Sequence, residues 1–159
     1  MDGLLALQEK ALYNIRLAKD TDFESLDVIA GDLNNFSSYS SISPLDATNE
    51  VELFQMLLKD GYIVVAEQDK QLVGVIGFIV SKMLGSDSLM MLPVLWWVVP
   101  EHRNGVISKE LLSTAEQIAK MRGASVSFLS ANVNNPKSIH RRYRQLGYAP
   151  QEIHFMKEL

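Results

Sequence analysis

The stretch best suited to chemistry is a short polar turn that carries Arg103 and separates an apolar run from an amphipathic run. The apolar run, 89–99, ends at Pro100, and apolar residues at helical spacing extend from Ile107 to Gly123. A strand that ends against a helix N-terminus can bind an anion, because the first helical N–H groups lack internal partners and the helix dipole adds positive charge. With Arg103 beside it, the turn is expected to receive a phosphate-bearing ligand. The alternative is an ordinary strand-to-helix connection that binds nothing.

Residue patterns upstream of the turn predict the elements that must position it. They indicate a short helix over 3–12, a strand at Asn14–Ala18, a helix from Phe23 to Leu33, a loop at Asn34–Pro44, a helix at Asp46–Lys59, and strands at Tyr62–Glu67, Leu72–Lys82 and Leu89–Val99. Short connections, with a hairpin turn at Gln68–Gln71, make the last three strands an antiparallel meander. Gly74 and Gly77 suggest a bulge or a close backbone approach. Phe36 and Tyr39 either pack the loop or form a substrate wall.

Downstream of the turn, Ser125–Val133 is predicted to be a strand parallel to Leu89–Val99, because a whole helix separates the two. Asn135 then caps a helix that ends at Gly147, and Glu152–Lys157 forms a last strand. The predicted fold class is α/β with the order βααβββαβαβ. It has a mostly antiparallel sheet with one central parallel strand pair and helices on both faces. Ligands of such sheets favour the crevice beyond the carboxyl ends of parallel strands.

Composition narrows the class of protein. A chain of 159 residues predicts a single domain over 1–159, with 1–13 as an N-terminal extension. The net charge of −4 provides no general attraction for nucleic acid. Cysteine is absent, which excludes disulfides, thiol nucleophiles and cysteine metal sites and suits a reducing, cytoplasmic location. No apolar run is long enough to cross a bilayer, the N-terminus does not resemble a signal peptide, and no metal site is predicted.

Two motifs resemble those of the GNAT superfamily of acyl-CoA-dependent N-acetyltransferases. VVPEHRNGVISKELL at 98–112 is similar to the family's strand end, turn and CoA-binding helix. NPKSIHRRYRQLGY at 135–148 is similar to its late motif, an Asn followed by a helix that ends in Tyr-x-x-x-Gly-aromatic. The resemblance covers roughly Asn14 to Leu159. It implies a GNAT-like fold, acetyl-CoA as cosubstrate, and transfer of the acetyl group to an amine by direct attack.

The resemblance also implies site residues. The pantetheine arm would be held by backbone around Val98, and Asn135 belongs to the late motif that completes the cofactor site. The pyrophosphate would be held by N–H groups from the turn and the helix start, at Arg103, Asn104, Gly105, Val106, Ile107 and Ser108. Relatives use a tyrosine at the position of Tyr143 as general acid for the leaving thiolate, although a core aromatic with a satisfied hydroxyl is the alternative.

The sequence departs from the family pattern in two places. Val106 and Ser108 stand where the family usually has Gly and Gly or Ala, and a glycine, Gly105, lies one position earlier. Ser108 also suits a helix N-cap. Moreover, Leu89–Val99 contains no carboxylate that could act as general base. The candidate general bases elsewhere in the chain are Glu101, Glu152 and His154. Each of them is more typical of a surface charge or a polar residue on a strand face.

Two further groups of residues have more than one interpretation. The last predicted helix is basic and either presents a solvated face or meets a 3′-phosphate or an acidic partner; its basic residues are Lys137, His140, Arg141, Arg142 and Arg144. Trp96 and Trp97 point to opposite faces of one strand, so at least one belongs to the core. The other either joins the core too, lines an amine pocket or contacts a second copy.

Two functions follow from these observations. The first is a cytoplasmic N-acetyltransferase that acts on a small-molecule or peptide amine, with no nucleic-acid or membrane partner and with a homodimer as one possible assembly. The second is a catalytically degenerate GNAT-like binding or regulatory module. The altered glycine pattern and the missing carboxylate in Leu89–Val99 favour the second function, whereas Arg103, Asn135, Tyr143 and Gly147 favour the first.

Overall fold

The structure of the chain, a computed structural model, describes residues 13–36, 47–131 and 136–159. The predicted helix at 3–12, the loop residue Tyr39 and the predicted cap Asn135 lie outside the described residues. Contacts divide the chain into two compact units, Met1–Phe128 and Leu129–Leu159. Within the described ranges, every helix is too short or too polar to cross a membrane.

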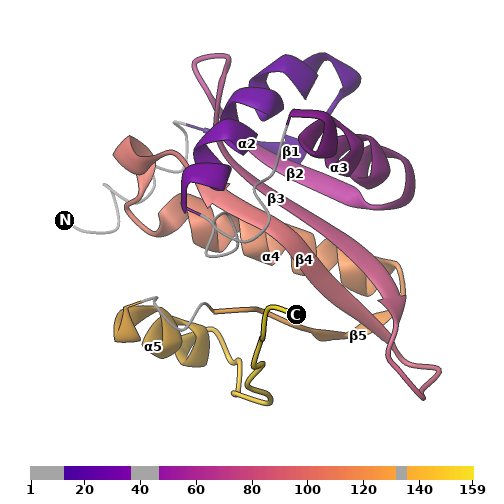
Figure 1. The fold of residues 1–159 in the computed structure, drawn as a ribbon. Helices are drawn as coiled ribbons and strands as arrows, with labels where there is room; N and C mark the ends of the chain where they lie inside the picture. Colours follow the sequence, from indigo (N-terminus) through magenta and orange to yellow (C-terminus); the bar gives the residue numbers. More distant parts are fainter. Residues whose placement is uncertain (1–12, 37–46, 132–135) are drawn as a thin grey trace. The chain divides into compact units, whose positions relative to one another are not determined.

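The first unit is built on a five-stranded sheet with the order β1-β2-β3-β4-β5 (Figure 1). Four neighbouring strands are antiparallel to one another, and β5 runs parallel to β4, as the sequence predicted. The elements are β1 (Asn14–Leu17), the 3₁₀ turn η1 (Asp20–Asp22), α2 (Phe23–Phe36), α3 (Ala47–Asp60), β2 (Tyr62–Gln68), β3 (Gln71–Lys82), β4 (Leu89–Val98), the 3₁₀ turn η2 (Pro100–His102), α4 (Val106–Met121) and β5 (Ala124–Ser127).

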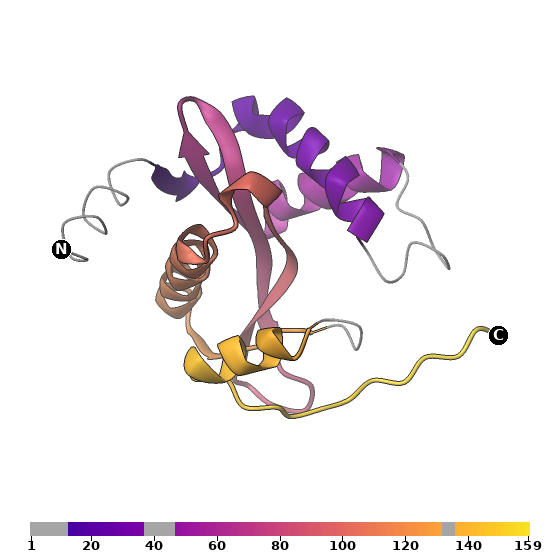
Figure 2. The ribbon, with the colours of Figure 1, turned by 90° about the vertical axis from the view of Figure 1, so that its left-hand side faces the viewer.

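Helices cover both faces of this sheet, which confirms the predicted layers. Figure 2 shows α4 on one side of the strands and α2 with α3 on the other. α4 buries one stripe because its apolar residues recur every four positions, at Ile107, Leu111, Ala115 and Ala119. The opposite core joins α2 and α3 to the sheet through Leu26, Ile29, Phe54, Leu57, Ile63, Val65, Val75 and Leu95.

Two glycines in β3 let both helix layers approach the sheet closely. A Cβ at Gly77 would lie 2.8 Å from Cδ1 of Leu57 in α3, and one at Gly74 would lie 3.0 Å from Cδ1 of Leu111 in α4. Side chains at these positions would push the helices away. The predicted close approach at Gly74 and Gly77 is therefore confirmed.

The turn between β2 and β3 was predicted correctly from the sequence, whereas the end of α2 was not. Asp69 and Lys70 have φ of 50° and 64°, which suits a two-residue turn between β2 and β3 and confirms the predicted hairpin. The start of the predicted loop Asn34–Pro44 is wrong, because α2 continues to Phe36; residues 37–44 lie outside the described residues. Polar side chains such as asparagine are weak helix breakers, so the Asn-rich composition misplaced this boundary.

A bulge bends β4 and limits its pairing with β5. Phe78 pairs with Pro93 and Gly77 pairs with Leu95, so Val94 is the extra residue of the bulged strand. β5 pairs only with the first residues of β4 and ends at Ser127. The predicted strand Ser125–Val133 is therefore too long, because the bulge turns β4 away and removes a straight edge for further pairing.

A charged cluster links β1 and η1 to β2. Arg16 Nη1 and Nη2 donate to both carboxylate oxygens of Asp22 at 2.7 and 2.9 Å, and Arg16 Nε donates to Glu67 at 3.1 Å. The backbone N–H of Lys19 donates to Asp22 at 2.7 Å. The Arg16 guanidinium lowers the pKa of Asp22, against an opposing effect of burial. Asp22 is thus a buried carboxylate whose charge is compensated.

The second unit contains α5 (Lys137–Gln145), which ends before Gly147, where φ is 92° as a helix C-terminus favours. The predicted strand Glu152–Lys157 is wrong, because this segment forms no regular element. The alternation of Ile153 and Phe155 is typical of a strand, but a strand needs a partner, and the described part of this unit contains none.

Candidate active site

The backbone N–H and C=O groups of Val98, the last residue of β4, point away from β3. Val99 N–H donates to the Val73 carbonyl oxygen at 3.0 Å, and the preceding residue, Val98, lies opposite Gly74. Because bonded and non-bonded pairs alternate along an antiparallel ladder, the N–H and C=O of Val98 point to the other edge of β4. β5 pairs on that same edge, at the start of the strand. The predicted pantetheine contact at Val98 therefore lies on the edge of β4 that faces away from the sheet centre.

Arg103 folds back from the turn onto β4. Its Nε donates to the carbonyl oxygen of Val98 at 2.7 Å. Its guanidinium carbon lies 4.2 Å from the centre of the Trp97 ring, in the range of a cation–π contact. Such a contact stabilises by about 0.5–1 kcal/mol where exposed and about 2 kcal/mol where desolvated. The full positive charge predicted beside the turn is thus held at the end of β4.

The turn itself is closed by backbone hydrogen bonds. His102 N–H donates to Val99 at 2.9 Å, Arg103 N–H to Pro100 at 3.2 Å, and Asn104 N–H to His102 at 2.9 Å. The φ and ψ of Arg103, −80° and 58°, are those of an inverse γ-turn. Gly105 has φ of 86°, a conformation that glycine adopts without strain. Gly105 is therefore the glycine that the turn needs, one position earlier than the family pattern.

α4 begins directly after this glycine, and the Asn104 side chain bonds to the first N–H group of the helix. Asn104 Oδ1 accepts the N–H of Val106 at 2.9 Å. Ser108 is not the N-cap, since Gly105 occupies that position and the Ser108 hydroxyl donates to the Gly105 carbonyl at 3.3 Å. Among the N–H groups predicted to hold a pyrophosphate, those of Arg103, Asn104 and Val106 thus donate within the chain. An anion at the helix start would exchange with the Asn104 side chain.

Tyr143 lies in the second unit and is fixed there by two contacts. Its hydroxyl donates to the carbonyl oxygen of Ser130 at 3.1 Å, and its ring lies 6.4 Å from that of Tyr148. Burial raises the pKa of the Tyr143 phenol, because a low-dielectric environment disfavours the phenolate. The hydroxyl is therefore protonated at neutral pH, and its hydrogen is bonded to the Ser130 carbonyl.

The three candidate general bases are surface residues. Glu101 is exposed in η2. His154 and Glu152 pair with each other at 3.4 Å, with exposed side-chain fractions of 89% and 72%. None of them lies in the kind of enclosed environment that tunes a catalytic base. In the part of the chain that the structure describes, no three acidic or imidazole side chains gather as metal ligands would.

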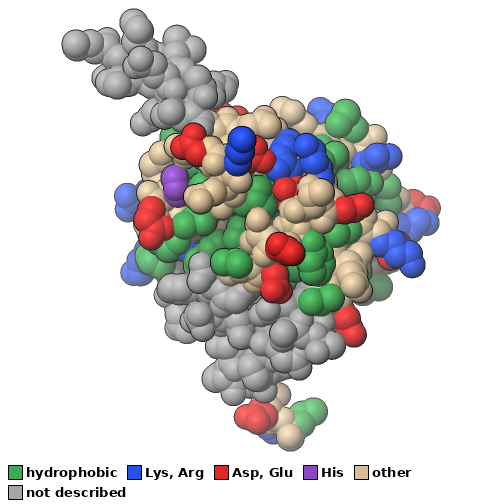
Figure 3. Space-filling model, turned by 90° about the horizontal axis from the view of Figure 1, so that it is seen from above, with side chains coloured by type: hydrophobic (Ala, Val, Ile, Leu, Met, Phe, Trp, Pro, Cys, Tyr) green, Lys and Arg blue, Asp and Glu red, His purple; other side chains and the backbone are tan. Residues whose placement is uncertain are grey.

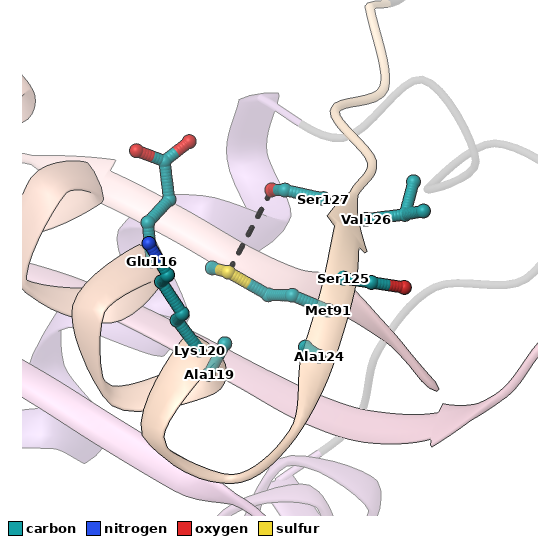
Figure 4. Close-up of a pocket in the computed structure, with 8 residues that line it drawn as sticks. All are labelled: Met91, Glu116, Ala119, Lys120, Ala124, Ser125, Val126 and Ser127. Carbon is teal, nitrogen blue, oxygen red and sulfur yellow. Dashed lines mark hydrogen bonds between the residues drawn. The ribbon is translucent and has the colours of Figure 1, made fainter. Parts of the chain in front are cut away.

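A shallow hollow between α4 and β5 is separate from the turn. Its volume is about 290 Å³, and its lining is Met91, Glu116, Ala119, Lys120, Ala124, Ser125, Val126 and Ser127. Figure 4 shows Ser127 and Met91 at its floor, with their Oγ and Sδ atoms 3.7 Å apart. Glu116 is ten residues beyond the start of α4, about 15 Å along the helix axis. The hollow is thus too far along α4 to belong to the anion turn.

The signs of the exposed charges differ between parts of the described surface. On the face that Figure 3 shows, acidic and basic groups of the described residues are interspersed. In α5, Lys137, His140, Arg141 and Arg144 are exposed, which fits the solvated basic face predicted from the sequence.

The contact between Arg103 and Trp97 could not be predicted from sequence. Trp97 packs against the core cluster on the side of α2 and α3, whereas alternation places Trp96 toward α4. The sequence predicted that at least one of the two tryptophans belongs to the core, and Trp97, which packs against the core cluster, confirms this. Its second role arises because η2 reverses the chain and returns Arg103 to the same strand end.

Comparisons with known proteins agree with this architecture. The family model described as an acetyltransferase (GNAT) domain matches residues 14–151. No curated protein matches the sequence. A putative acetyltransferase from Pyrococcus furiosus has 23% identity and a TM-score of 0.74, with 92% of this chain and 99% of that chain covered.

Two further solved structures are similar in fold. Glucosamine-6-phosphate N-acetyltransferase from Arabidopsis thaliana has 15% identity and a TM-score of 0.70, with 92% and 97% of the two chains covered. An aminoglycoside N-acetyltransferase in complex with CoA has 14% identity and a TM-score of 0.73, with 92% and 94% covered. The fold, the order of its elements and the family match over most of the chain lead to one conclusion: this protein belongs to the GNAT family of acetyltransferases.

Proposed function

We propose that this chain transfers the acetyl group of acetyl-CoA to a primary amine of a small molecule or a peptide. One observation carries the proposal: the Arg103 guanidinium, the start of α4 and the outward backbone edge of Val98 meet at one end of β4. A cation and a helix N-terminus suit a diphosphate, and a strand edge suits an amide-containing arm. Acetyl-CoA contains both chemical groups.

The residues fit the cosubstrate in distinct ways. The diphosphate lies against the segment Arg103–Ser108, where it replaces the Asn104 side chain at the Val106 N–H. The pantetheine arm follows β4 at Val98. Asn135 is assigned to the acetyl-CoA site because of its position in the late motif. It lies outside the described residues.

The reaction is direct. The amine nitrogen attacks the thioester carbonyl carbon, the C–S bond breaks, and the acetylated amine loses its proton to water. Tyr143 exchanges its hydrogen bond to Ser130 for one to the leaving sulfur, donates its hydroxyl hydrogen there and regains a proton from solvent. Burial raises the pKa of Tyr143, which keeps this donor protonated at neutral pH. The role of Tyr143 rests on its position in the late motif and is a proposal that mutation can test.

The second candidate is a GNAT-like module that binds or regulates without turnover. The observation in its favour is that Arg103, Asn104 and Val106 N–H groups already bond within the chain, in a turn where Val106 replaces a glycine of the family pattern. Moreover, β4 contains no carboxylate that could act as base. A substrate that arrives deprotonated, or a water chain, removes the need for one.

The test is an assay of free CoA release with a thiol reagent, run on a panel of small amines, amino sugars and peptides. Acetyl transfer predicts release that depends on both the protein and one class of amine, with the acetylated product identified by mass spectrometry. If acetyl-CoA binds but no amine class is acetylated, the binding module replaces the enzyme.

Three broader predictions accompany this proposal. The chain functions as one domain over 1–159, and it works in the cytoplasm, in keeping with its lack of cysteine. The third concerns assembly: a homodimer is one assembly that the chain could form, and sedimentation at several protein concentrations distinguishes it from a monomer.

A further inference from the structure

Trp97 contacts both the hydrophobic core of the first unit and Arg103 of the turn before α4. Its ring packs against the buried cluster between the sheet and the helices α2 and α3. The Arg103 guanidinium lies over the same ring, 4.2 Å from its centre. The ring is partly buried against this cluster, so it offers a packed surface to the Arg103 side chain, which otherwise has many rotamers.

A second contact also restricts the guanidinium that lies over this ring. Arg103 Nε donates to the Val98 carbonyl oxygen at 2.7 Å. An arginine has five N–H donors in a planar fork, and this bond uses one of them. The contact with the ring and the hydrogen bond to Val98 both restrict the guanidinium. Together they hold the charge at the end of β4, where the chain turns toward α4.

We propose that Trp97 is a positioning residue for acetyl-CoA: it holds Arg103 in the orientation that receives the diphosphate. This inference rests on the proposed function, because it needs acetyl-CoA to be the ligand of the turn. Trp97 acts through Arg103 and touches no reacting atom. A side chain that is ordered before binding loses less conformational freedom on binding, so the stack raises affinity.

The experiment is a calorimetric titration of acetyl-CoA into the wild-type chain and into Trp97→Leu, Trp97→Phe, Arg103→Leu and the Trp97→Leu/Arg103→Leu double variant. Loss of the aromatic face is expected to weaken binding about 2- to 5-fold in Trp97→Leu, the range of a cation–π contact to an exposed arginine such as Arg103. Trp97→Phe, which keeps a ring, should recover most of the affinity. In the Arg103→Leu background, Trp97→Leu should have no further effect.

A spectroscopic measurement tests the contact itself and does not depend on the ligand. In a Trp96→Phe background, Trp97 is the single tryptophan of the chain. Arg103→Leu should then change the Trp97 emission without acetyl-CoA present, whereas Lys120→Leu, at the far end of α4, should not. Should Trp97→Leu fail to fold in thermal melts, Trp97→Phe and Arg103→Lys carry the affinity comparison.

The outcomes separate this inference from the proposed function. No binding to the wild-type chain would overturn both. Binding to the wild type with equal or tighter affinity in Trp97→Leu would overturn the positioning role alone, as would an equal loss with or without Arg103. Unchanged Trp97 emission in Arg103→Leu would mean that the stack does not form in solution.

Discussion

Asn104 Oδ1 accepts a hydrogen bond from the backbone N–H of Val106 at 2.9 Å, so a side chain of the turn occupies the first donor of α4. A diphosphate at this helix start would take the same N–H. The Asn104 side chain therefore competes with the diphosphate for the Val106 N–H. Removing this side chain should change protein stability and acetyl-CoA affinity in opposite directions.

Asn104→Ala should destabilise the chain and yet raise its affinity for acetyl-CoA. The Asn104–Val106 hydrogen bond contributes about 0.5–1.5 kcal/mol without ligand and nothing once the phosphate has replaced it. By linkage, binding should tighten about 2- to 10-fold. Thermal melts and calorimetry on the same variant measure the two effects. Weaker binding would show instead that the Asn104 side chain contacts the ligand.

Arg103→Ala should weaken acetyl-CoA binding by about 1.5–3 kcal/mol, the contribution of a charge-assisted hydrogen bond. Because the proposed contact is to the diphosphate and not to the 3′-phosphate, CoA and dephospho-CoA should lose affinity by the same factor. Lys120→Ala is the matched control, since Lys120 is an exposed cation near the other end of α4. Unchanged affinity in Arg103→Ala would mean that Arg103 serves only to bridge Trp97 and Val98.

Tyr143→Phe removes the hydroxyl that donates to Ser130 and keeps the ring beside Tyr148. We expect turnover to fall about a hundredfold or more, as for loss of a general acid, with near-normal acetyl-CoA binding. Because burial raises the pKa of Tyr143, the wild-type rate should not decline from loss of this proton until the pH exceeds the ordinary tyrosine range, about 10. Full activity in the variant would reduce Tyr143 to a packing residue. Tyr148→Phe, on the neighbouring ring, is the control.

The Arg16–Asp22 pair predicts a specific acid sensitivity. Arg16 lowers the pKa of Asp22 in the folded chain, so the pair stabilises the fold above the unfolded-state pKa of about 3.9. That stability is lost as the pH falls through the lower folded-state value. Arg16→Met should cost about 1.5–3 kcal/mol at pH 7 and much less at pH 2, measured by urea unfolding.

An exposed pair provides the control for this prediction. Lys82 and Asp87 lie 2.9 Å apart with exposed side-chain fractions of 67% and 99%. Lys82→Met should change stability by about 1 kcal/mol or less at either pH, since solvent screens such pairs. Equal effects of Arg16→Met and Lys82→Met would contradict the account of the buried cluster.

Local signals explain which parts of this structure could be predicted. The turn was readable because Pro100 ends the apolar run and Gly105 precedes a regular apolar repeat. The glycines of β3 were readable because a strand rarely lacks side chains without a packing reason. These features depend on a few neighbouring residues.

What could not be predicted depends on contacts between distant residues. β5 is shorter than its apolar pattern suggests, because the bulge at Val94 in another strand determines where pairing ends. Ile153 and Phe155 alternate as in a strand, but alternation does not supply a partner. The Arg103–Trp97 contact needs both the face of β4 and the reversal of η2, and neither is encoded in the spacing of the two residues.

The most direct test of the central claim is a calorimetric titration of acetyl-CoA into the wild-type chain, with a thermal melt of the same sample. The account predicts saturable binding and a raised Tm, because a ligand that binds only the folded state stabilises it, by about 2.7 kcal/mol at a hundred times Kd. No heat of binding and no change in Tm at millimolar acetyl-CoA would contradict it.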